Sequence, residues 1–567
     1  MQFRTLHVKG FRCFLKAANL SFEPGLTILV GENSTGKSTT ALAIAKLFSC
    51  VQSGLASGLM EPEDYPFRKI GPVKIEATLE LTAQEVQRQL IDPLIPRDVS
   101  QALQERLERW LKAKGTIIVI SLSQSDHHWL SQVHWGKISI GANLLAQDGV
   151  TVGGNGTLWF SVIHRIEDGQ TTLETLESAI KDTQMVLDRP PASELMDDLG
   201  KFLRETYKAT PEFRNRSSPG SSSTVMESWQ GSELGSVLFN LRNHPSDQIR
   251  KRYEDVKRTF SSLFPRYTIE ATHSGPGGGS PEVLFYETGH AQPITLRNIS
   301  AGVHQVLNWV TNLIGREGLV LFIDHPEEHL HIHSSRFMLR IFREASEKNQ
   351  VIIATHSPFF VDADAPHAVR KFWWTVEGSR VSEPTLSSLN QRELGQMRTA
   401  LRSLNNREVV FARCALLVEE ESTHAFLRSV APVLGYDLDA DGVSVISVDG
   451  DGGYKHFHTL LDGLGIPYVN LRDRAWGHNP KYPPSRFFSL DTGSIENLMD
   501  EHGLGELRLQ IAREVGDNKV RVAAELARRL EHQQVPEIFD RVLKAAKELA
   551  TGSPYLEKVE GEEVAQL

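Results

Sequence analysis

Continuous runs of apolar residues mark three strands in the first two thirds of this chain. Residues 27–30 read Thr-Ile-Leu-Val, residues 319–323 read Leu-Val-Leu-Phe-Ile, and residues 351–354 read Val-Ile-Ile-Ala. Runs of this kind, without alternation, are typical of strands in a parallel sheet that is covered on both faces. Apolar residues with helical spacing follow the first run, at 39–48. The pattern therefore predicts an α/β domain.

The same pattern starts again from residue 408 and continues towards the end of the chain. Mainly apolar runs at 411–418, 442–448 and 466–471 alternate with stretches of helical spacing. This β-α-β order predicts a second parallel sheet, in a domain with a Rossmann-like layout. Because the carboxyl ends of parallel strands share one edge of the sheet, ligand sites are expected at that edge.

Spacing and composition also set the expected limits of the domains. Residues near 165–265 have helical spacing around a Ser/Pro/Gly-rich stretch, so a helical insert is expected inside the first domain. A polar connector is expected between the two domains. The predicted division is 1–370 for the first domain, 371–407 for the connector and 408–567 for the second domain.

The loop after the first apolar run reads Gly-Glu-Asn-Ser-Thr-Gly-Lys-Ser. A strand, a glycine-rich loop of this spacing and a helix predict a P-loop, whose backbone N–H groups cradle phosphate oxygens. Lys37 would reach the terminal phosphates, and the Ser38 hydroxyl would hold Mg²⁺. The residues of this loop that are expected to bind ATP are Gly31, Glu32, Asn33, Ser34, Thr35, Gly36, Lys37, Ser38 and Thr39.

Two strand ends and one helix start carry further polar residues that a P-loop needs. Asp324 ends the second apolar run and can hold Mg²⁺ through water. His356 follows the third run, where it can sense the γ-phosphate. Ser300 and Gly302 stand at the start of a helical pattern. A hydroxyl and an N–H group at a helix N-terminus form a second phosphate-binding device.

The order of these four motifs resembles that of ABC-type ATPases of the SMC-like branch: P-loop, signature, Walker B and switch histidine. In that family the signature helix contacts the ATP that is held by the other subunit. The resemblance implies a homodimer or higher homo-oligomer formed through the ATPase domain, with Ser300 and Gly302 acting in trans. It also implies that the helical insert takes part in dimerisation.

One residue departs from that family's pattern. The family usually reads Asp-Glu-Pro-Glu, whereas residues 324–327 read Asp-His-Pro-Glu, so His325 stands in the position of the catalytic base. A histidine can act as a general base near neutral pH. The alternative, which is favoured, is slow hydrolysis, with ATP as a ligand that holds the dimer together. The H-x-x-E-H pattern that begins at His325 also matches one class of zinc peptidase, but Pro326 disfavours the continuous helix that this motif needs.

Two carboxylates follow strands of the second domain. Glu419 comes directly after the run at 411–418, and Asp473 follows the third run of this domain. A parallel sheet would bring both to one edge. Oxygen ligands are those that Mg²⁺ and Mn²⁺ prefer. The sequence therefore predicts a site for one of these ions.

The second domain resembles a Toprim domain, the metal-binding module of topoisomerases, primases and a nuclease family. The resemblance rests on Glu419, the glycine-rich loop at 449–453 and Asp473. An SMC-like ATPase followed by a Toprim domain is the layout of the OLD (overcoming lysogenisation defect) family of nucleases, which is similar to the Gabija large subunit and to retron-associated effectors. Glu496 fits this family's later acidic position, and Lys519 fits its late lysine.

The resemblance implies ATP-regulated nicking or cleavage of DNA in anti-phage defence, by a one- or two-metal mechanism. Glu419, Asp473 and Glu496 would be metal ligands, and Lys519 would stabilise the scissile phosphate. DNA is the implied partner. A further defence partner is also implied, either a helicase or a reverse transcriptase with its nucleic acid.

The Toprim motifs are altered in this chain. Families of this type usually show V-E-G-x-x-E and D-x-D, whereas here Glu420 replaces the glycine, Thr423 replaces the second acid of the first motif, and Ala475 replaces the second acid of the later motif. These departures leave a second function open: an ATP-gated scaffold with a degenerate Toprim site that acts through a partner protein. The acids that could compensate are Glu421, Asp449, Asp451 and Asp491.

The overall composition indicates the cellular compartment and the kinds of partner that are expected. No run of eighteen apolar residues occurs, so neither a membrane-spanning helix nor a membrane partner is expected. The 3 cysteines are far apart, which favours a reducing compartment, the cytoplasm, and argues against a cysteine metal site. With a net charge of −10, any DNA binding must come from a local basic surface. Arg472, Arg474 and the stretch 513–529 are the candidates for that surface.

Overall fold

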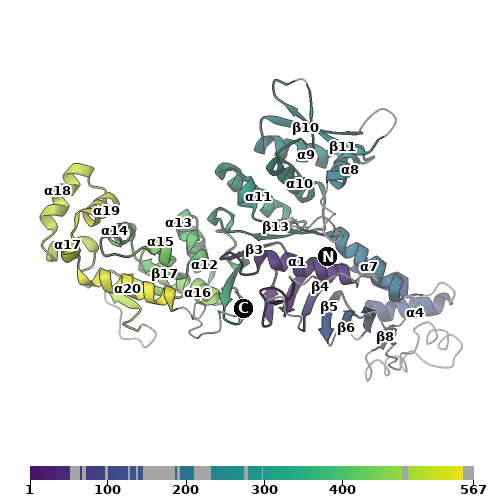
Figure 1. Cartoon of the computed structure of the whole chain (residues 1–567), viewed down its shortest axis with the longest axis horizontal. Helices are drawn as coiled ribbons and strands as arrows, with labels where there is room; N and C mark the ends of the chain where they lie inside the picture. The colour runs from purple at the N-terminus through teal and green to yellow at the C-terminus, as the bar shows by residue number, and fades with distance from the viewer. Residues whose placement is uncertain are drawn as a thin grey trace, which may run out of the picture. The chain divides into compact units, whose positions relative to one another are not determined.

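The computed structural model describes residues 1–51, 64–66, 72–95, 100–125, 128–135, 138–144, 185–187, 192–209, 231–273, 279–290, 292–296, 298–474 and 483–552. The chain forms two compact units (Figure 1). The first comprises Met1–Ile28 and Gly36–Thr355, and the second comprises Leu29–Thr35 and His356–Leu567. The predicted domain limits at 370 and 408 stay predictions.

The first unit contains a mainly antiparallel sheet near the N-terminus. Alternating burial along its strands places one face in the core, as in β4, where Ile75, Ala77 and Leu79 are buried. Only β7 and β8 pair in parallel. Its described strands are, in sheet order, β2 (Ala18–Ser21), β1 (Gln2–Lys9), β4 (Lys74–Glu80), β5 (Ile117–Ser125), β6 (His128–Trp135), β7 (Ile138–Leu144) and β8 (Met185–Leu187).

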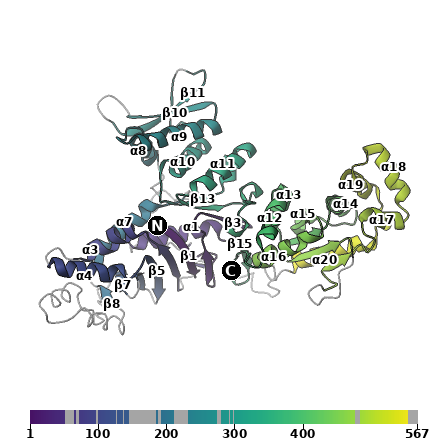
Figure 2. The same ribbon diagram turned by 180° about the vertical axis from the view of Figure 1, so that it is seen from behind.

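A parallel sheet forms the centre of the first unit. The strands β13 (Val320–Asp324) and β14 (Gln350–Ala354) are buried along their whole length and pair in parallel, which confirms the strands predicted from the apolar runs. The Val351 N–H donates to the Gly25 carbonyl at 2.8 Å, just before β3 (Leu26–Gly31). Figures 1 and 2 show α1 (Lys37–Cys50) on one side of β13 and α11 (Ile332–Ala345) on the other.

The sequence did not predict one strand of this sheet. β9 (Tyr207–Ala209) pairs in parallel with β13, although its residues fall in the stretch that was expected to be a helical insert. Tyr207 is buried, and its hydroxyl donates to the Ala41 carbonyl of α1 at 3.2 Å. Part of the expected insert therefore belongs to the ATPase core, because this side chain packs against the helix that follows the P-loop.

The rest of the expected insert is helical where the structure describes it. α7 (Ala192–Thr206) leads into β9, and α8 (Gly231–Arg242) and α9 (Asp247–Leu263) pack together. Residues 151–184 and 210–230 lie outside the described part of the chain. A small antiparallel sheet covers α8 and α9 and consists of β10 (Tyr267–His273), β11 (Pro281–Glu287) and β12 (Ile294–Thr295).

The second unit begins with strands where the sequence predicted only a connector. β15 (Val369–Thr375) and β16 (Gly378–Ser382) pair antiparallel. Phe372 and Trp373 are buried, so the start of 371–407 is part of a core. The polar helical part of the connector is confirmed as α12 (Gln391–Ala400) and α13 (Leu404–Arg407).

The C-terminal half of this unit is the predicted β-α-β domain. Its sheet has the order β18-β17-β19-β20, and each neighbouring pair is parallel. The strands are β17 (Cys414–Val418), β18 (Val443–Ser447), β19 (Tyr468–Arg472) and β20 (Phe487–Ser489). The main helices are α14 (Glu421–Val430), α16 (Tyr454–Leu464), α17 (Ile495–Glu501), α18 (Gly505–Val515), α19 (Lys519–Arg529) and α20 (Glu537–Thr551).

The predicted fold class is confirmed: an α/β P-loop ATPase head is followed by a Rossmann-like domain. Across the described residues, no helix combines the length and the apolar character that crossing a membrane requires.

Candidate functional site

The P-loop has the local geometry that the sequence predicted. β3 ends at Gly31, whose φ is +146°, and a Cβ atom there would lie 2.5 Å from the Phe372 carbonyl oxygen. Gly36, with φ +111°, precedes the first turn of α1. The Thr35 hydroxyl donates to the Glu32 carbonyl at 2.8 Å, which closes the loop on itself. Glycine is required at 31 because any side chain would collide with β15.

The structure brings three predicted nucleotide-site residues together. Lys37 is the first residue of α1 and is 4% exposed, and Ser38 follows it. Ser38 hydrogen-bonds to Asp324, which ends β13. Burial raises the pKa of Asp324, and this hydrogen bond opposes the shift. The two side chains that were expected to hold Mg²⁺ therefore lie side by side.

His325 follows Asp324 in a strained backbone conformation. Its φ of +46° and ψ of +56° lie in the left-handed region, which a non-glycine residue adopts only at a cost. The imidazole Nε2 lies 3.6 Å from the Asp324 Oδ1 atom, and Nδ1 lies 3.5 Å from the Glu327 Oε1 atom. The ring therefore lies between the Asp324 and Glu327 carboxylates.

Sequence reasoning assigned no role to Glu327. The Thr355 hydroxyl donates to its Oε2 atom at 2.7 Å, while its Oε1 atom faces the His325 ring. Glu327 therefore links the residue after Asp324 to the end of β14, directly before His356. The sequence feature that could have identified Glu327 is its place as the second acid in the Asp-His-Pro-Glu run.

The zinc-peptidase alternative is wrong. His325 precedes a 3₁₀ helix (Pro326–His329) and is not part of an α-helix. The motif requires two histidines on one continuous helix, and the turn after Asp324 prevents that arrangement.

Ser300 caps a helix, as predicted. α10 (Ala301–Gly315) begins directly after it, and the Ser300 hydroxyl accepts from the Val303 N–H at 3.5 Å. Gly302 lies in the first turn of α10. The roles of Ser300 and Gly302 in trans, and that of His356 as a switch, stay predictions.

The two strand-end carboxylates of the second unit converge. Glu419 follows β17 and Asp473 follows β19, and these strands are neighbours. The Asp473 N–H donates to the Glu419 Oε2 atom at 3.1 Å. Asp473 is 6% exposed, and burial, followed by the charges of Glu419, Glu420 and Glu496, raises its pKa to about 7.

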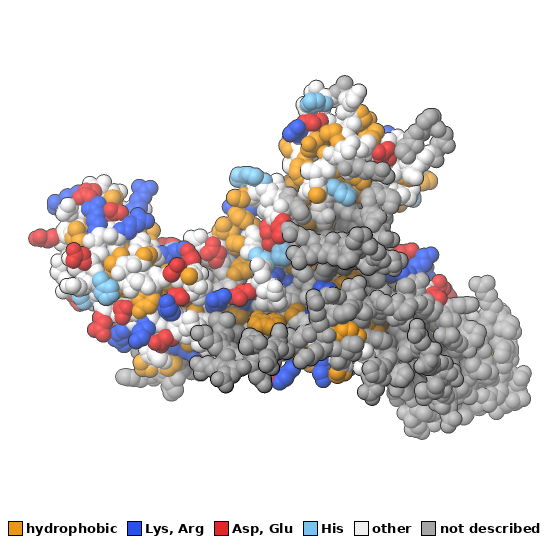
Figure 3. Space-filling model, viewed as in Figure 1, with side chains coloured by type: hydrophobic (Ala, Val, Ile, Leu, Met, Phe, Trp, Pro, Cys, Tyr) orange, Lys and Arg blue, Asp and Glu red, His pale blue; other side chains and the backbone are white. Residues whose placement is uncertain are grey.

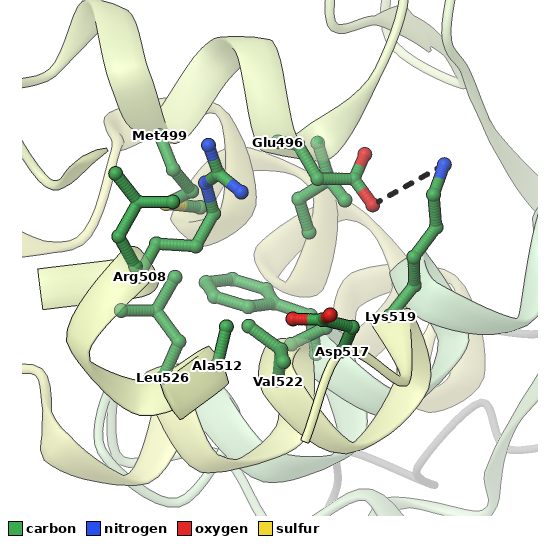
Figure 4. A pocket seen from close by; sticks show the side chains of 12 residues that line it. Glu496, Met499, Arg508, Ala512, Asp517, Lys519, Val522 and Leu526 are labelled. Atoms are coloured by element: carbon green, nitrogen blue, oxygen red, sulfur yellow. Dashed lines mark ion pairs between the residues drawn. The ribbon is translucent and has the colours of Figure 1, made fainter. Parts of the chain in front are cut away.

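Glu496 and Lys519 lie beside this pair. Glu496 is in the first turn of α17, and Lys519 is the first residue of α19. The Lys519 Nζ atom lies 3.8 Å from the Glu496 Oε1 atom (Figure 4). Both act on Asp473: the charge of Glu496 raises its pKa, and the charge of Lys519 lowers it. The late acid and the late lysine of the Toprim pattern therefore reach the same site as Asp473.

The arrangement fits a hard divalent cation. The Asp473 Oδ1 atom and both carboxylate oxygens of Glu496 are buried and have no hydrogen-bond partner. Within the described ranges, no three His, Cys, Asp or Glu side chains already stand close enough together to hold a metal ion. Mg²⁺ commonly uses one or two carboxylates and keeps several waters. Glu419 and Asp473 meet that requirement.

The glycine-rich loop holds the backbone of Glu419. The Gly450 N–H donates to the Glu419 carbonyl at 2.9 Å. A Cβ atom on Gly453 would lie 1.9 Å from the Val448 carbonyl oxygen, so the loop packs tightly after β18. The loop therefore fixes the strand end that carries the metal-site acid.

Of the altered Toprim positions, the one at Glu420 has a structural explanation. Glu420 precedes α14, and Glu421 lies in its first turn, where acids interact favourably with the helix dipole. Thr423 is buried in α14, and its hydroxyl has no hydrogen-bond partner. Ala475 lies outside the described residues. At the position where the family has an acid, this chain therefore has a buried hydroxyl without a hydrogen-bond partner.

The other acids of the loops serve the fold. Asp449 has a left-handed φ of +59°, which suits a turn. Asp451 accepts from the Arg472 guanidinium at 2.5 Å. Asp491 accepts from the Ser489 hydroxyl at 2.6 Å. The left-handed backbone agrees with the interpretation of Asp449 as a turn former, and that of Asp451 stays a prediction.

Comparison with known families gives the order of domains that the sequence motifs predicted, an ATPase domain followed by a Toprim domain. Residues 178–362 match the AAA domain family whose description refers to the AbiEii toxin of a Type IV TA system, and residues 1–55 match the AAA ATPase domain family. Residues 410–474 match the Toprim domain of overcoming lysogenization defect protein-like proteins. The chain therefore resembles OLD-family proteins in having ATPase family matches followed by a Toprim match.

The chain resembles two curated proteins over part of their length. It is 27% identical over 189 residues to the OLD nuclease of Thermus scotoductus, which covers 31% of this chain and 34% of that protein. It is 21% identical over 244 residues to the uncharacterized protein MJ1542 of Methanocaldococcus jannaschii, which covers 43% of this chain and 30% of that protein. The chain thus spans about a third of the length of the curated relatives that it matches.

Two solved structures are also similar. The Smc head domain with an extended coiled coil, derived from Pyrococcus furiosus, is 13% identical, with a TM-score of 0.36 over 71% of this chain and 100% of that chain. The C-terminal region of the Xanthomonas campestris pv. campestris OLD protein is 19% identical, with a TM-score of 0.21 over 25% of this chain and 97% of that chain.

Proposed function

We propose that this protein is an ATP-regulated, divalent-metal-dependent DNA endonuclease, which nicks or cleaves DNA in anti-phage defence. The observation that carries the proposal is the convergence of Glu419 and Asp473, where the Asp473 N–H donates to the Glu419 carboxylate. Crowding of buried acids has a free-energy cost that raises the pKa of Asp473 to about 7, and a bound cation would remove that cost.

Each residue of the site has a proposed role. Glu419 and Asp473 hold Mg²⁺ or Mn²⁺, with Glu496 as a third acid. The ion would act as a Lewis acid and would lower the pKa of a bound water. Lys519 is exposed, which leaves its ammonium group able to contact the scissile phosphate. The catalytic role of His325 concerns only ATP hydrolysis in the other unit.

The proposed ATP regulation is supported by contacts inside the second unit, which includes P-loop residues 29–35. The Arg413 Nε atom donates to the Glu32 carboxylate at 2.6 Å. Arg413 directly precedes β17, and Glu419 follows the other end of this strand. A change in the P-loop when nucleotide binds would therefore act on the strand that carries a metal-site acid.

A second set of contacts joins β15 to the Toprim domain. The buried Lys371 ammonium donates to the Val410 and Ala412 carbonyls, at 2.9 Å each, directly before β17. The Trp373 indole N–H donates to the Leu464 carbonyl at the end of α16, at 3.0 Å. Because the neighbouring Phe372 also contacts Gly31 of the P-loop, β15 offers a rigid connection between the nucleotide loop and the nuclease sheet.

At the nucleotide site, Lys37, Ser38 and Asp324 would hold ATP and Mg²⁺. We further propose a homodimer or higher homo-oligomer, in which Ser300 and Gly302 of one subunit reach the nucleotide of the other. We propose slow hydrolysis, because His325 stands in the position where the family has an acid as the catalytic base. DNA and a defence partner, such as a helicase or a reverse transcriptase with its nucleic acid, complete the proposal.

A second candidate function is an ATP-gated scaffold that works through a partner protein. The observation that favours it is Thr423, whose buried hydroxyl occupies the place of a family acid and has no hydrogen-bond partner. A site that has lost one ligand could bind metal too weakly for catalysis.

Supercoiled plasmid separates the two functions. We expect nicking in Mg²⁺ or Mn²⁺ by the wild-type protein, a change in its rate when ATP is added, and loss of nicking in Glu419→Ala. The control is Asp462→Ala, an exposed acid of α16. ATP-dependent oligomerisation without nicking in any metal would contradict the nuclease and support the scaffold.

A further inference from the structure

A pocket opens in the second unit beside the Toprim carboxylates (Figure 4). It has a volume of about 260 Å³ and lies between α14, α17, α18 and α19. Its walls are apolar and include Phe426, Met499, Leu509, Val522 and Leu526. Neither the nucleotide site nor the metal-site pair uses these side chains.

Charged groups stand at the edge of this apolar pocket. Glu496 and Lys519 line it, and both also act electrostatically on Asp473, so the pocket lies next to the proposed cleavage centre. Arg508 also lines it, and its guanidinium is held in place by two hydrogen bonds to Asp500, at 3.0 and 2.8 Å. A fixed, planar guanidinium can stack on a nucleobase.

The surface around the pocket carries basic residues. Figure 3 shows Lys and Arg side chains over α18 and α19, among some acids. The exposed basic residues of this stretch include Arg513, Lys519, Arg521 and Arg528. Basic side chains on the two helices that form part of the pocket, together with Arg508 and Lys519 in its wall, suit a ligand with a phosphate backbone and an aromatic base.

We propose that this pocket receives one unpaired nucleobase of the DNA strand, next to the phosphate that is cut. The proposal rests on the nuclease function above and adds what the site requires of its substrate: a base that has left the helical stack. The apolar walls replace the stacking that the base loses, and the Arg508 plane covers it. The exposed Lys519 ammonium group then contacts the adjoining phosphate.

The occupant is a base because the pocket joins three features that a base-binding site needs. It is lined mainly by apolar side chains, it has a planar cation in its wall, and it opens beside Glu496, which acts electrostatically on Asp473. An apolar side chain of a partner protein would fill the walls but would have no use for Lys519 or for the nearby carboxylates.

The test measures binding and does not require cutting. Fluorescence anisotropy, in Ca²⁺, compares a DNA duplex with an unpaired bubble and the same duplex with abasic sites in the bubble. We expect the wild-type protein to bind the base-bearing bubble about fivefold to a hundredfold more tightly, the range for one stacked base. Equal affinities for the two bubbles would overturn the proposal.

Substitutions in the pocket test whether it causes the preference for the base-bearing bubble. Ala512 lines the pocket and is half-buried, so Ala512→Phe fills the space with little effect on the core. We expect it to abolish the preference for the base-bearing bubble. The matched control is Ala524→Phe, also half-buried but outside the pocket wall, which should keep the preference. A second variant, Leu509→Ala, removes an exposed wall residue and should weaken the preference several-fold.

The outcomes separate this proposal from the nuclease function. A protein that nicks plasmid but binds both bubbles equally retains the nuclease function and loses the pocket proposal. A protein that discriminates between the bubbles without nicking retains the pocket and loses the nuclease function. Retention of the preference in Ala512→Phe would place base binding elsewhere and overturn the assignment.

Discussion

Removing the charge of Asp473 should stabilise the metal-free protein at alkaline pH. The pKa of this carboxyl is raised from 3.8 to about 7, because it is buried and lies near Glu419, Glu420 and Glu496. Between these two pKa values the folded state holds a proton that the unfolded state has released. Stability therefore falls as the pH rises from about 4 to about 7, and it stays low above that range.

The size of the effect follows from the shift. From pH 5 to the pKa of about 7, each unit corresponds to 1.36 kcal/mol, which gives at most about 2.7 kcal/mol. We expect about 1–2 kcal/mol, because water and salt screen part of the repulsion. The Asp473→Asn variant lacks the charge, so its advantage over the wild-type protein should grow by this amount between pH 5 and pH 8.

Urea denaturation of the metal-free proteins at pH 5 and pH 8 measures that growth. Mn²⁺ at pH 8 should then stabilise the wild-type protein but leave Asp473→Asn almost unchanged, because the variant lacks a ligand. The control is Asp462→Asn, an exposed acid of the same domain, which should follow the wild-type protein at both values. An advantage of Asp473→Asn that is equal at pH 5 and pH 8 would refute the electrostatic reasoning.

The nucleotide site and its connection give three further predictions. Lys37→Ala should abolish ATP binding, measured with a fluorescent ATP analogue, because the lysine charge faces the phosphates. An unchanged affinity for the analogue would contradict the P-loop assignment. His325→Glu should raise ATP turnover about tenfold or more, since a carboxylate restores the family's base; a fall in phosphate release would identify His325 as the working base. Arg413→Ala should leave metal-dependent nicking intact but reduce its response to ATP, because the contact with Glu32 is lost; an unchanged ATP response would exclude this connection.

The sequence predicted the strands that carry the chemistry because these strands are continuous apolar runs. β13, β17 and β19 each end at a predicted site residue or directly before it, and β14 ends two positions before His356. The P-loop could also be located, because it requires glycine at fixed positions. Gly31 and Gly36 have positive φ angles, and a side chain at Gly31 would collide with Phe372.

Elements defined by tertiary contacts could not be predicted. β9 has three residues and becomes a strand because β13 supplies its hydrogen bonds and α1 accepts the Tyr207 hydroxyl. β15 lies in a stretch that reads as a connector, and its burial depends on contacts with Gly31 and with the carbonyls before β17. The residues that β9 and β15 contact are distant in the sequence, so no local sequence pattern reveals them.

The same limit applies to the candidate site. Glu327 has its place through the Thr355 hydroxyl, 28 positions further along the chain. The raised pKa of Asp473 comes first from burial and then from acids on two other segments, Glu419 and Glu420 after β17 and Glu496 in α17, which only folding brings together. Sequence spacing identified the residue types at the Toprim site, whereas their mutual electrostatics depend on the arrangement of the helices around it.

The most direct test of the central claim is Mn²⁺ binding to the nucleotide-free protein, measured by titration calorimetry. Without ATP the P-loop site lacks the phosphates that help to hold a metal ion there, so the Toprim carboxylates should dominate the signal. The account predicts a Mn²⁺ site that is lost in Glu419→Ala and kept in Asp462→Ala. Equal Mn²⁺ affinity in Glu419→Ala and the wild-type protein would contradict it.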